Sequence, residues 1–381
     1  MISIKSDKII TENGLFDGYL YVEDGKVTEL SREEKPCAES YDYTGYYVSP
    51  GFIDMHTHGA GGYSFLNSTA EDVIAGCNYH LQFGTTCILP TISAEKFSVM
   101  EQAVINIRKA MESGKAPTIH GAHLEGPYFS LKQCGAQNTD YITPPVKADY
   151  ERLLAEQGEF VKRWSYAPEH DSEGEFCKYI TDRGVIASAG HTDAIYDDMK
   201  TAIANGCNLV THLYSCTSTI TRDHGFRRLG VIETAYLEDD LYVEIIADGR
   251  HLPPELLKLI LKTKDNNKIA LITDSLEIAG TDIKEGDGMG GVPFIVEDGV
   301  CKLKDRSAFA GSVATADVLI RTMVQDVGCT IPAAVKMLTQ IPAEILKVNK
   351  GVLAPGKDAD IVVFDEDFMV KQVFLAGKKV S

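Results

Sequence analysis

Short apolar runs alternate with stretches of helical spacing through most of the chain. Residues 70–81, for example, place apolar side chains on one helical face and follow Ser68 and Thr69, either of which can cap a helix. Pro253 and Pro254 begin another predicted helix. Eight strands are predicted, at residues 51–56, 84–89, 119–124, 163–167, 185–190, 208–212, 243–248 and 268–273. Parallel strands joined by helices in this number predict a (β/α)₈ barrel of the TIM type.

The two ends of the chain show a different pattern, typical of short strands joined by tight turns. The segments that resemble strands are 19–22, 27–30, 360–364 and 372–377. We expect both termini to build one small β-sandwich domain from residues 1–50 plus 349–381. The barrel domain would then span residues 51–348.

Polar side chains follow the predicted strands at the ends where barrel enzymes carry their active sites. The first strand ends in His56 and His58, and alternate side chains of a strand share a face, so these two imidazoles point the same way. The ends of the later strands supply further candidates: His123, Glu125, Glu169, His191, His212, His251 and Asp274.

Imidazole and carboxylate groups are the ligands that zinc, iron, cobalt and manganese take in proteins. Glu125, His191 and His212 come from nearby strands and are predicted to hold one divalent ion. His56 and His58 could hold a second ion, with Glu125 as a bridge. The sequence therefore predicts one or two divalent metal ions in each chain.

Asp274 follows the last strand, where a carboxylate could take a proton from a metal-activated water and deliver it to a leaving group. Simpler interpretations exist: structural or solvated histidines, a structural carboxylate at Glu125, or a helix cap at Asp274. The gathering of these residues at one edge favours metal-assisted hydrolysis. His123 has the strand parity of Glu125, and we interpret it as a supporting or structural residue.

Composition narrows the class of protein further. The chain of 381 residues is 44% hydrophobic and carries a net charge of −18 without a run of Lys or Arg, which argues against nucleic acid as a partner. Nine scattered cysteines without a Cys-x-x-Cys pair indicate reduced thiols in a cytoplasmic protein. No apolar run has the length of a membrane span, and no signal-peptide core is present, so we expect no membrane partner.

These motifs, in this order, resemble those of the N-acetylglucosamine-6-phosphate deacetylase family within the amidohydrolase superfamily. The matching pieces are Pro-Gly-Phe-Ile-Asp-Met-His-Thr-His at 50–58, His-Leu-Glu-Gly-Pro-Tyr at 123–128, Gly-Ala-Gln-Asn at 135–138, Ala-Pro-Glu at 167–169, Gly-His-Thr at 190–192, Thr-His-Leu-Tyr at 211–214, Ala-Asp-Gly-Arg-His at 247–251, Thr-Asp at 273–274, Ala-Gly-Ser at 310–312 and the tail at 351–361. The resemblance spans essentially the whole chain. His-Leu-Glu-Gly-Pro is its most family-specific piece.

The resemblance implies a metal-dependent hydrolase that removes the N-acetyl group from an amino-sugar phosphate. N-acetylglucosamine 6-phosphate would give glucosamine 6-phosphate and acetate, with Asp274 as general base and acid. It also implies a homodimer in which an arginine of the neighbouring subunit reaches the phosphate. The positions that it assigns to substrate binding are Ala136, Gln137, Ser215, Cys216, Arg222, His251, Phe309 and Gly311.

The chain departs from the family pattern at two places that bear on the substrate. Ser215 and Cys216 stand where the family usually has Asn-Ala. Asp223 falls, in an ungapped count, where the phosphate-binding arginine is expected. The nearby candidates for that role are Arg222, which we favour, Arg227 and Arg228.

These departures leave the substrate open. The same chemistry could act on N-acetylgalactosamine 6-phosphate or on an unphosphorylated N-acetyl sugar. A non-catalytic sugar-phosphate sensor and a metal-dependent deaminase are further alternatives. Release of acetate distinguishes the deacetylases from the other two.

Overall fold

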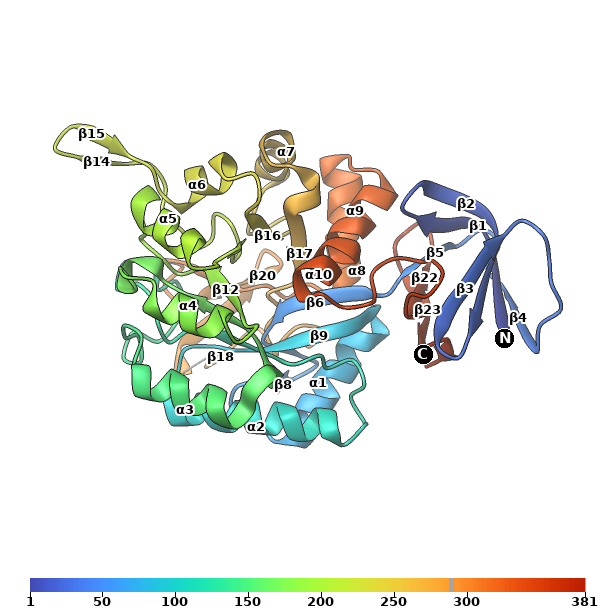
Figure 1. The fold of residues 1–381 in the computed structure, drawn as a ribbon, viewed down its shortest axis with the longest axis horizontal. Coiled ribbons are helices and arrows are strands. Elements are labelled where there is room, and N and C mark those ends of the chain that lie inside the picture. The colour runs from blue at the N-terminus through green and yellow to red at the C-terminus, as the bar shows by residue number, and fades with distance from the viewer. Residues whose placement is uncertain (288–290, 381) are drawn as a thin grey trace.

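The computed structural model describes residues 1–287 and 291–380, and its larger part is a barrel of eight parallel strands (Figure 1). The strands neighbour one another in the order β17-β16-β13-β12-β11-β10-β9-β6. All eight predicted strands are present, which confirms the barrel fold. Their bounds are β6 Phe52–Thr57, β9 Thr85–Ile92, β10 Ala122–Glu125, β11 Val161–Tyr166, β12 Ile186–Ala189, β13 Leu209–Val210, β16 Tyr242–Ile246 and β17 Ile269–Ile272.

The barrel strands are largely buried on both faces because helices cover the outside and side chains fill the inside. Every residue of β9 is buried, for instance. The barrel is closed between β6 and the chain that follows β17. There the Asp274 N–H donates to the His56 carbonyl at 2.9 Å, and the His58 N–H donates to the Ser275 carbonyl at 2.7 Å. Three candidate site residues, His56, His58 and Asp274, therefore lie where the barrel closes.

Helices surround the barrel, as Figure 1 shows. They are α1 Ala70–Gln82, α2 Phe97–Glu112, α3 Lys147–Gln157, α4 Glu175–Thr181, α5 Tyr196–Ala204, α6 Val231–Leu237, α7 Pro254–Thr263, α8 Ala316–Thr322, α9 Ile331–Leu338 and α10 Gln340–Leu346. The predicted start of α1 is confirmed, because Thr69 caps it and shares a capping box with Asp72. Among the described residues, none of these helices combines the length and apolar character needed to cross a membrane.

Both termini build the small second domain, as predicted (Figure 1). Its strands are β1 Ile2–Thr11, β2 Gly14–Glu23, β3 Lys26–Ser31, β4 Glu39–Asp42, β5 Tyr47–Pro50, β22 Ile361–Phe364, β23 Val370–Leu375 and β24 Lys378–Lys379. They form one hydrogen-bonded sheet that curves around its own apolar core, so the ring of Tyr41 on β4 packs against Phe374 on β23 at 5.4 Å. The antiparallel pairing of β22 with β5 joins the C-terminal strands to the segment that enters the barrel.

The described structure also contains three small sheets that the sequence did not predict. A two-stranded hairpin joins β14 Thr221–Asp223 to β15 Phe226–Arg228 and projects from the barrel (Figure 1). A four-stranded sheet follows the last barrel strand and contains β18 Glu285–Asp287, β19 Pro293–Glu297, β20 Val300–Leu303 and β21 Phe309–Gly311. The short pair β7 Gly59–Ala60 and β8 Tyr63–Ser64 follows β6 directly.

Candidate active site

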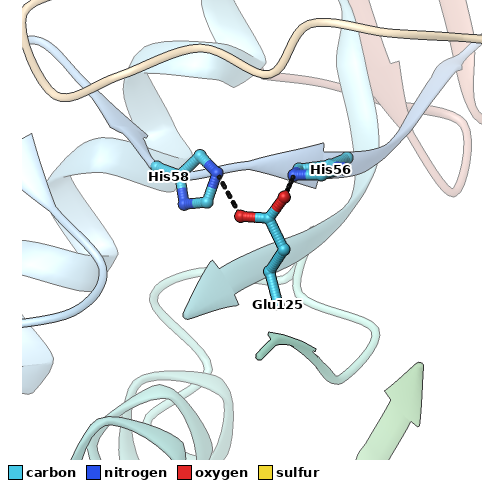
Figure 2. Close-up of side chains that lie close together, drawn as sticks. All are labelled: His56, His58 and Glu125. Atoms are coloured by element: carbon cyan, nitrogen blue, oxygen red, sulfur yellow. Dashed lines mark ion pairs between the residues drawn. The ribbon is translucent and has the colours of Figure 1, made fainter. Parts of the chain in front are cut away.

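Four histidines surround the carboxylate of Glu125 at the carboxyl ends of the barrel strands. Glu125 ends β10, and its Oε1 lies 3.3 Å from His56 Nε2, 3.1 Å from His191 Nε2 and 3.0 Å from His212 Nε2. Its Oε2 lies 3.3 Å from His58 Nε2 (Figure 2). The alternation along β6 thus turns both imidazoles of the His-x-His pair toward one carboxylate.

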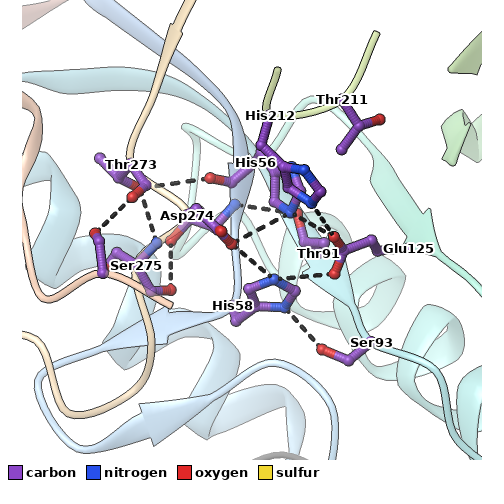
Figure 3. A network of polar contacts seen from close by, with 12 residues as sticks. His56, His58, Thr91, Ser93, Glu125, Thr211, His212, Thr273, Asp274 and Ser275 are labelled. Atoms are coloured by element: carbon purple, nitrogen blue, oxygen red, sulfur yellow. Dashed lines mark hydrogen bonds and ion pairs between the residues drawn. The ribbon is translucent and has the colours of Figure 1, made fainter. Parts of the chain in front are cut away.

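Asp274 stands beside this cluster, on the side of the His-x-His pair. Its Oδ1 lies 3.2 Å from His58 Nε2 and 3.4 Å from His56 Nε2 (Figure 3). The hydrogen bond from its own N–H to the His56 carbonyl anchors it to β6. Its side chain is almost completely buried, so its carboxylate belongs to the floor of the site.

Three of these residues have a left-handed backbone conformation. The φ angles are 47° at His191, 30° at His212 and 47° at Asp274. A non-glycine residue in this region costs on the order of 1 kcal/mol or more, and it persists only where the surrounding structure enforces it. All three lie just past the end of a barrel strand, where the sharp change of direction aims His191 and His212 at Glu125 and aims Asp274 at the His56–His58 pair.

The donor set fits divalent metal ions. Two atoms that bind one ion at about 2.1 Å with a tetrahedral angle lie about 3.4 Å apart, close to the separations between the histidine nitrogens and the carboxylate oxygens here. Three groups of possible ligands share members: His56, His58 and Glu125; His56, His212 and Asp274; and Glu125, His191 and His212. Both ring nitrogens of His56 are also buried without a hydrogen-bond partner in the described part of the chain.

The electrostatics of the cluster favour bound positive charge. Burial opposes ionisation of the Glu125 carboxyl, but the imidazoles of His56, His191 and His212 hold its pKa well below its usual range. Burial likewise opposes charge on His58, yet the carboxylates of Asp274 and Glu125 raise its pKa to about 10. The two carboxylates therefore stay ionised and stabilise cations, whether protons or metal ions.

The outer ring nitrogens fix the orientation of most of these histidines. Nδ1 of His58 lies 2.9 Å from Ser93 Oγ, Nδ1 of His191 lies 3.0 Å from the Gln133 carbonyl, and Nδ1 of His212 lies 2.9 Å from the Ser215 carbonyl. The inner nitrogens are thereby left for a ligand. His123, by contrast, has both nitrogens engaged, one by Thr91 Oγ1 at 3.0 Å and the other by Ser165 Oγ at 2.8 Å. This arrangement fits the structural role that its position in the sequence indicated.

A cavity of about 250 Å³ opens above the cluster. Seven of the eight positions assigned to substrate by resemblance line it: Ala136, Gln137, Ser215, Cys216, His251, Phe309 and Gly311. Gln137 also donates its amide to Glu125 Oε2 at 2.9 Å, a contact that the sequence did not indicate. Tyr214, Ala308 and Ala310 line the cavity as well; Tyr214 and Ala310 lie within the motifs at 211–214 and 310–312, whereas nothing in the sequence pointed to Ala308.

Arg222, the eighth position, does not line this cavity. It lies on the exposed hairpin β14–β15, opposite Arg227 in the register. In the same hairpin Asp223 pairs with Arg228, at 3.2 Å between carboxylate and guanidinium. Within one chain, therefore, the structure does not bring Arg222 to the other candidate residues.

The eight-stranded barrel, with a histidine and carboxylate cluster at the carboxyl ends of its strands, defines the class of metal-dependent barrel hydrolases. The model of the amidohydrolase family matches residues 47–380, and the chain belongs to this family.

Named relatives match this chain over more than nine-tenths of their length. The chain is 32% identical to N-acetylglucosamine-6-phosphate deacetylase of Bacillus subtilis, over 96% of this chain and 93% of that protein. It is 29% identical to N-acetylgalactosamine-6-phosphate deacetylase of Shewanella, over 99% and 95%. The crystal structure of N-acetyl-D-glucosamine-6-phosphate deacetylase from Mycobacterium smegmatis superposes with a TM-score of 0.93 at 28% identity, covering 100% of both chains. The family resemblance of the motifs is confirmed.

Proposed function

We propose that this chain is a metal-dependent deacetylase that hydrolyses the N-acetyl amide of N-acetylglucosamine 6-phosphate, giving glucosamine 6-phosphate and acetate. The single observation that carries the proposal is the convergence of four imidazoles on Glu125, with Asp274 beside them, at the floor of a cavity. The relatives named for this reaction support the choice of substrate.

The proposed metal ligands are Glu125, His191 and His212 for one ion and His56, His58 and Glu125 for a second. Zinc, iron, cobalt and manganese all suit this mixture of imidazole and carboxylate. When bound, such an ion lowers the pKa of water and polarises the acetyl carbonyl.

Asp274 is the proposed proton carrier. Burial opposes its ionisation, but His56 and His58 hold its pKa well below the usual range, so it begins the reaction as a carboxylate. It can then accept the proton that the attacking water releases. The same oxygen delivers that proton to the nitrogen of the breaking amide bond, so that the free amine leaves and acetate remains.

The residues that line the cavity would orient the sugar. The Nδ1–H of His251 is donated to Asp248 at 2.8 Å, which leaves Nε2 as the nitrogen available to substrate hydroxyl or phosphate oxygens. Phe309 packs against the His251 ring at 4.9 Å and closes that side. The side-chain hydroxyl of Ser215 and the main chain at Ala136 are proposed to contact the sugar.

We further propose a homodimer in which Arg222 serves the neighbouring subunit. Arg222 lies on an exposed hairpin outside its own cavity, and the phosphate of the substrate needs a cationic partner. A hairpin that projects from the barrel has the form required to reach a second copy (Figure 1).

An acetate-release assay with wild-type protein and the Asp274→Asn variant tests the proposal. We expect wild-type protein to release acetate from N-acetylglucosamine 6-phosphate with a higher kcat/KM than from N-acetylgalactosamine 6-phosphate or the unphosphorylated sugars. Asp274→Asn should abolish turnover and leave metal content intact. Retained turnover in the variant would sink the role of Asp274, and binding of the sugar phosphate without acetate release would support a sensor instead.

A further inference from the structure

A buried ion pair lies inside the barrel beneath the candidate metal cluster. Arg163 on β11 and Glu244 on β16 are both completely buried, and both ends of the guanidinium contact the two carboxylate oxygens. Arg163 is also held by Ser188 Oγ at 3.2 Å and Thr211 Oγ1 at 2.9 Å. Such a pair is costly to bury, and apolar side chains of similar size would hold the strands together equally well. Its presence at this depth calls for a role other than packing.

The carboxylate of this pair faces one metal-ligand candidate. Glu244 Oε2 lies 3.7 Å from His56 Nδ1, while Nε2 on the other side of the same ring lies 3.3 Å from Glu125. Because Nε2 must be unprotonated to bind a cation, the ring proton must then stay on Nδ1. Glu244 is the carboxylate that this N–H faces. The distance is longer than a hydrogen bond, so the contact is an electrostatic one between the ring and the carboxylate.

His56 differs in this respect from the other three candidate ligands. The outer nitrogens of His58, His191 and His212 each meet a neutral hydroxyl or carbonyl oxygen at 2.9 to 3.0 Å. His56 is thus the one histidine of the four that faces a carboxylate through Nδ1. A carboxylate partner increases the basicity of an imidazole ligand and fixes its ring, which a neutral oxygen does less strongly.

We propose that Glu244 is a positioning residue for His56, and that it sets the affinity of the metal position formed by His56, His58 and Glu125. Arg163 holds the Glu244 carboxylate in place and balances its charge inside the barrel. The inference rests on the metal dependence proposed above. It concerns the second ion alone, because Glu125, His191 and His212 can hold the first without help from Glu244.

The test is the substitution Glu244→Gln, which keeps the size of the side chain and, through its amide oxygen, one of the two contacts with Arg163 but removes the charge. Wild-type and variant proteins are stripped with a chelator and titrated with Mn²⁺, with the bound ions counted by elemental analysis. Electron paramagnetic resonance then reports whether two ions share a bridging carboxylate. We expect the first ion to bind as in wild type and the second to bind about 10- to 100-fold more weakly.

Two further variants separate positioning from packing. Ser188→Ala removes a neighbour of Arg163 that has no contact with His56, so the second ion should bind as in wild type. Arg163→Met combined with Glu244→Leu replaces both charges by apolar side chains of similar size, which keeps the barrel filled. This double variant should fold and should lose the second ion in the same way, and it decides the question if Glu244→Gln does not fold.

Three outcomes would overturn the inference. One is wild-type affinity for the second ion in either Glu244 variant. Another is an equal loss in Ser188→Ala, which would assign the effect to packing. The third is a wild-type protein that binds a single ion, and in that case acetate release would still show the proposed deacetylation to be intact.

Discussion

Thr273 and Asp54 join the first and last strands of the barrel through a hydrogen bond of 2.5 Å between the threonine hydroxyl and the carboxylate. Asp54 lies two residues before His56, and Thr273 lies directly before Asp274. The same carboxylate accepts the backbone N–H of His56 at 3.2 Å. One buried aspartate therefore links the segment with the candidate ligand His56 to the segment with the proposed proton carrier Asp274.

This contact can be tested by Thr273→Val. The change leaves the buried Asp54 carboxylate without its best donor, so the free energy of unfolding should fall by about 1 to 3 kcal/mol. Urea unfolding measures the loss. Thr273→Ser keeps the hydroxyl and should stay near wild type, and an equal loss in both variants would show that the hydroxyl is not the source of the effect.

The histidine pair at the end of β6 should determine how many ions bind. Replacing His56 and His58 together by Asn should reduce the metal content from two ions per chain to one, because Glu125, His191 and His212 remain. Acetate release should fall but stay above that of Asp274→Asn. Unchanged metal stoichiometry in the double variant would contradict the two-ion arrangement.

Arg222 should act on the phosphate and on nothing else in the substrate. A charge-assisted hydrogen bond contributes about 1.5 to 3 kcal/mol, so Arg222→Ala should raise KM for the phosphorylated sugar by about 10- to 100-fold. The KM for the unphosphorylated sugar should not change. Arg228→Ala is the matched control, because Arg228 already pairs with Asp223 in the same hairpin. An effect confined to Arg228→Ala would transfer the role to that residue.

His80 should make stability depend on pH. Burial of its ring in α1 lowers its pKa to about 4, against 6.5 for an exposed histidine, so the unfolded chain binds the additional proton. The stability contributed by neutral His80 is complete above pH 6.5 and is lost as the pH falls toward 4.

The variant His80→Gln keeps a donor for the Gly59 carbonyl and removes the titration. Between pH 8 and pH 5, wild type should lose about 2 kcal/mol more than this variant, measured by urea unfolding of metal-free protein. Parallel curves for the two proteins would contradict the assignment.

The barrel could be predicted from sequence because each strand is a short apolar run that helices cover, and because turn residues delimit it. The sheet β18–β21 was missed, since its strands are short, partly exposed and without strict alternation. Every residue of the two strands in the hairpin β14–β15 is exposed, so the hairpin offers no pattern of buried hydrophobic positions.

Sequence patterns were similarly limited in predicting the roles of residues in the candidate active site. Alternation along β6 could predict that His56 and His58 share a face, but alternation along β10 could not separate Glu125 from His123, which have the same parity. The partners of the His123 ring decide that point, and they come from β9 and β11. Arg163 and Glu244 gave no signal, because a charged residue within an apolar strand indicates nothing until its partner on another strand is known.

Strands from both termini form the sheet of the small domain, so damage to either end of the chain would affect the segment that carries His56 and His58. Gly377 lies against Ile2 and Val22, so the two ends of the polypeptide are neighbours. β22 pairs with β5, one residue before the strand that carries His56 and His58. Proteolytic trimming of the C-terminus would thus act on a ligand pair hundreds of residues away in the chain. A short linker between the ends, with new termini opened in an exposed loop, would instead give a circular permutant with an undisturbed cavity.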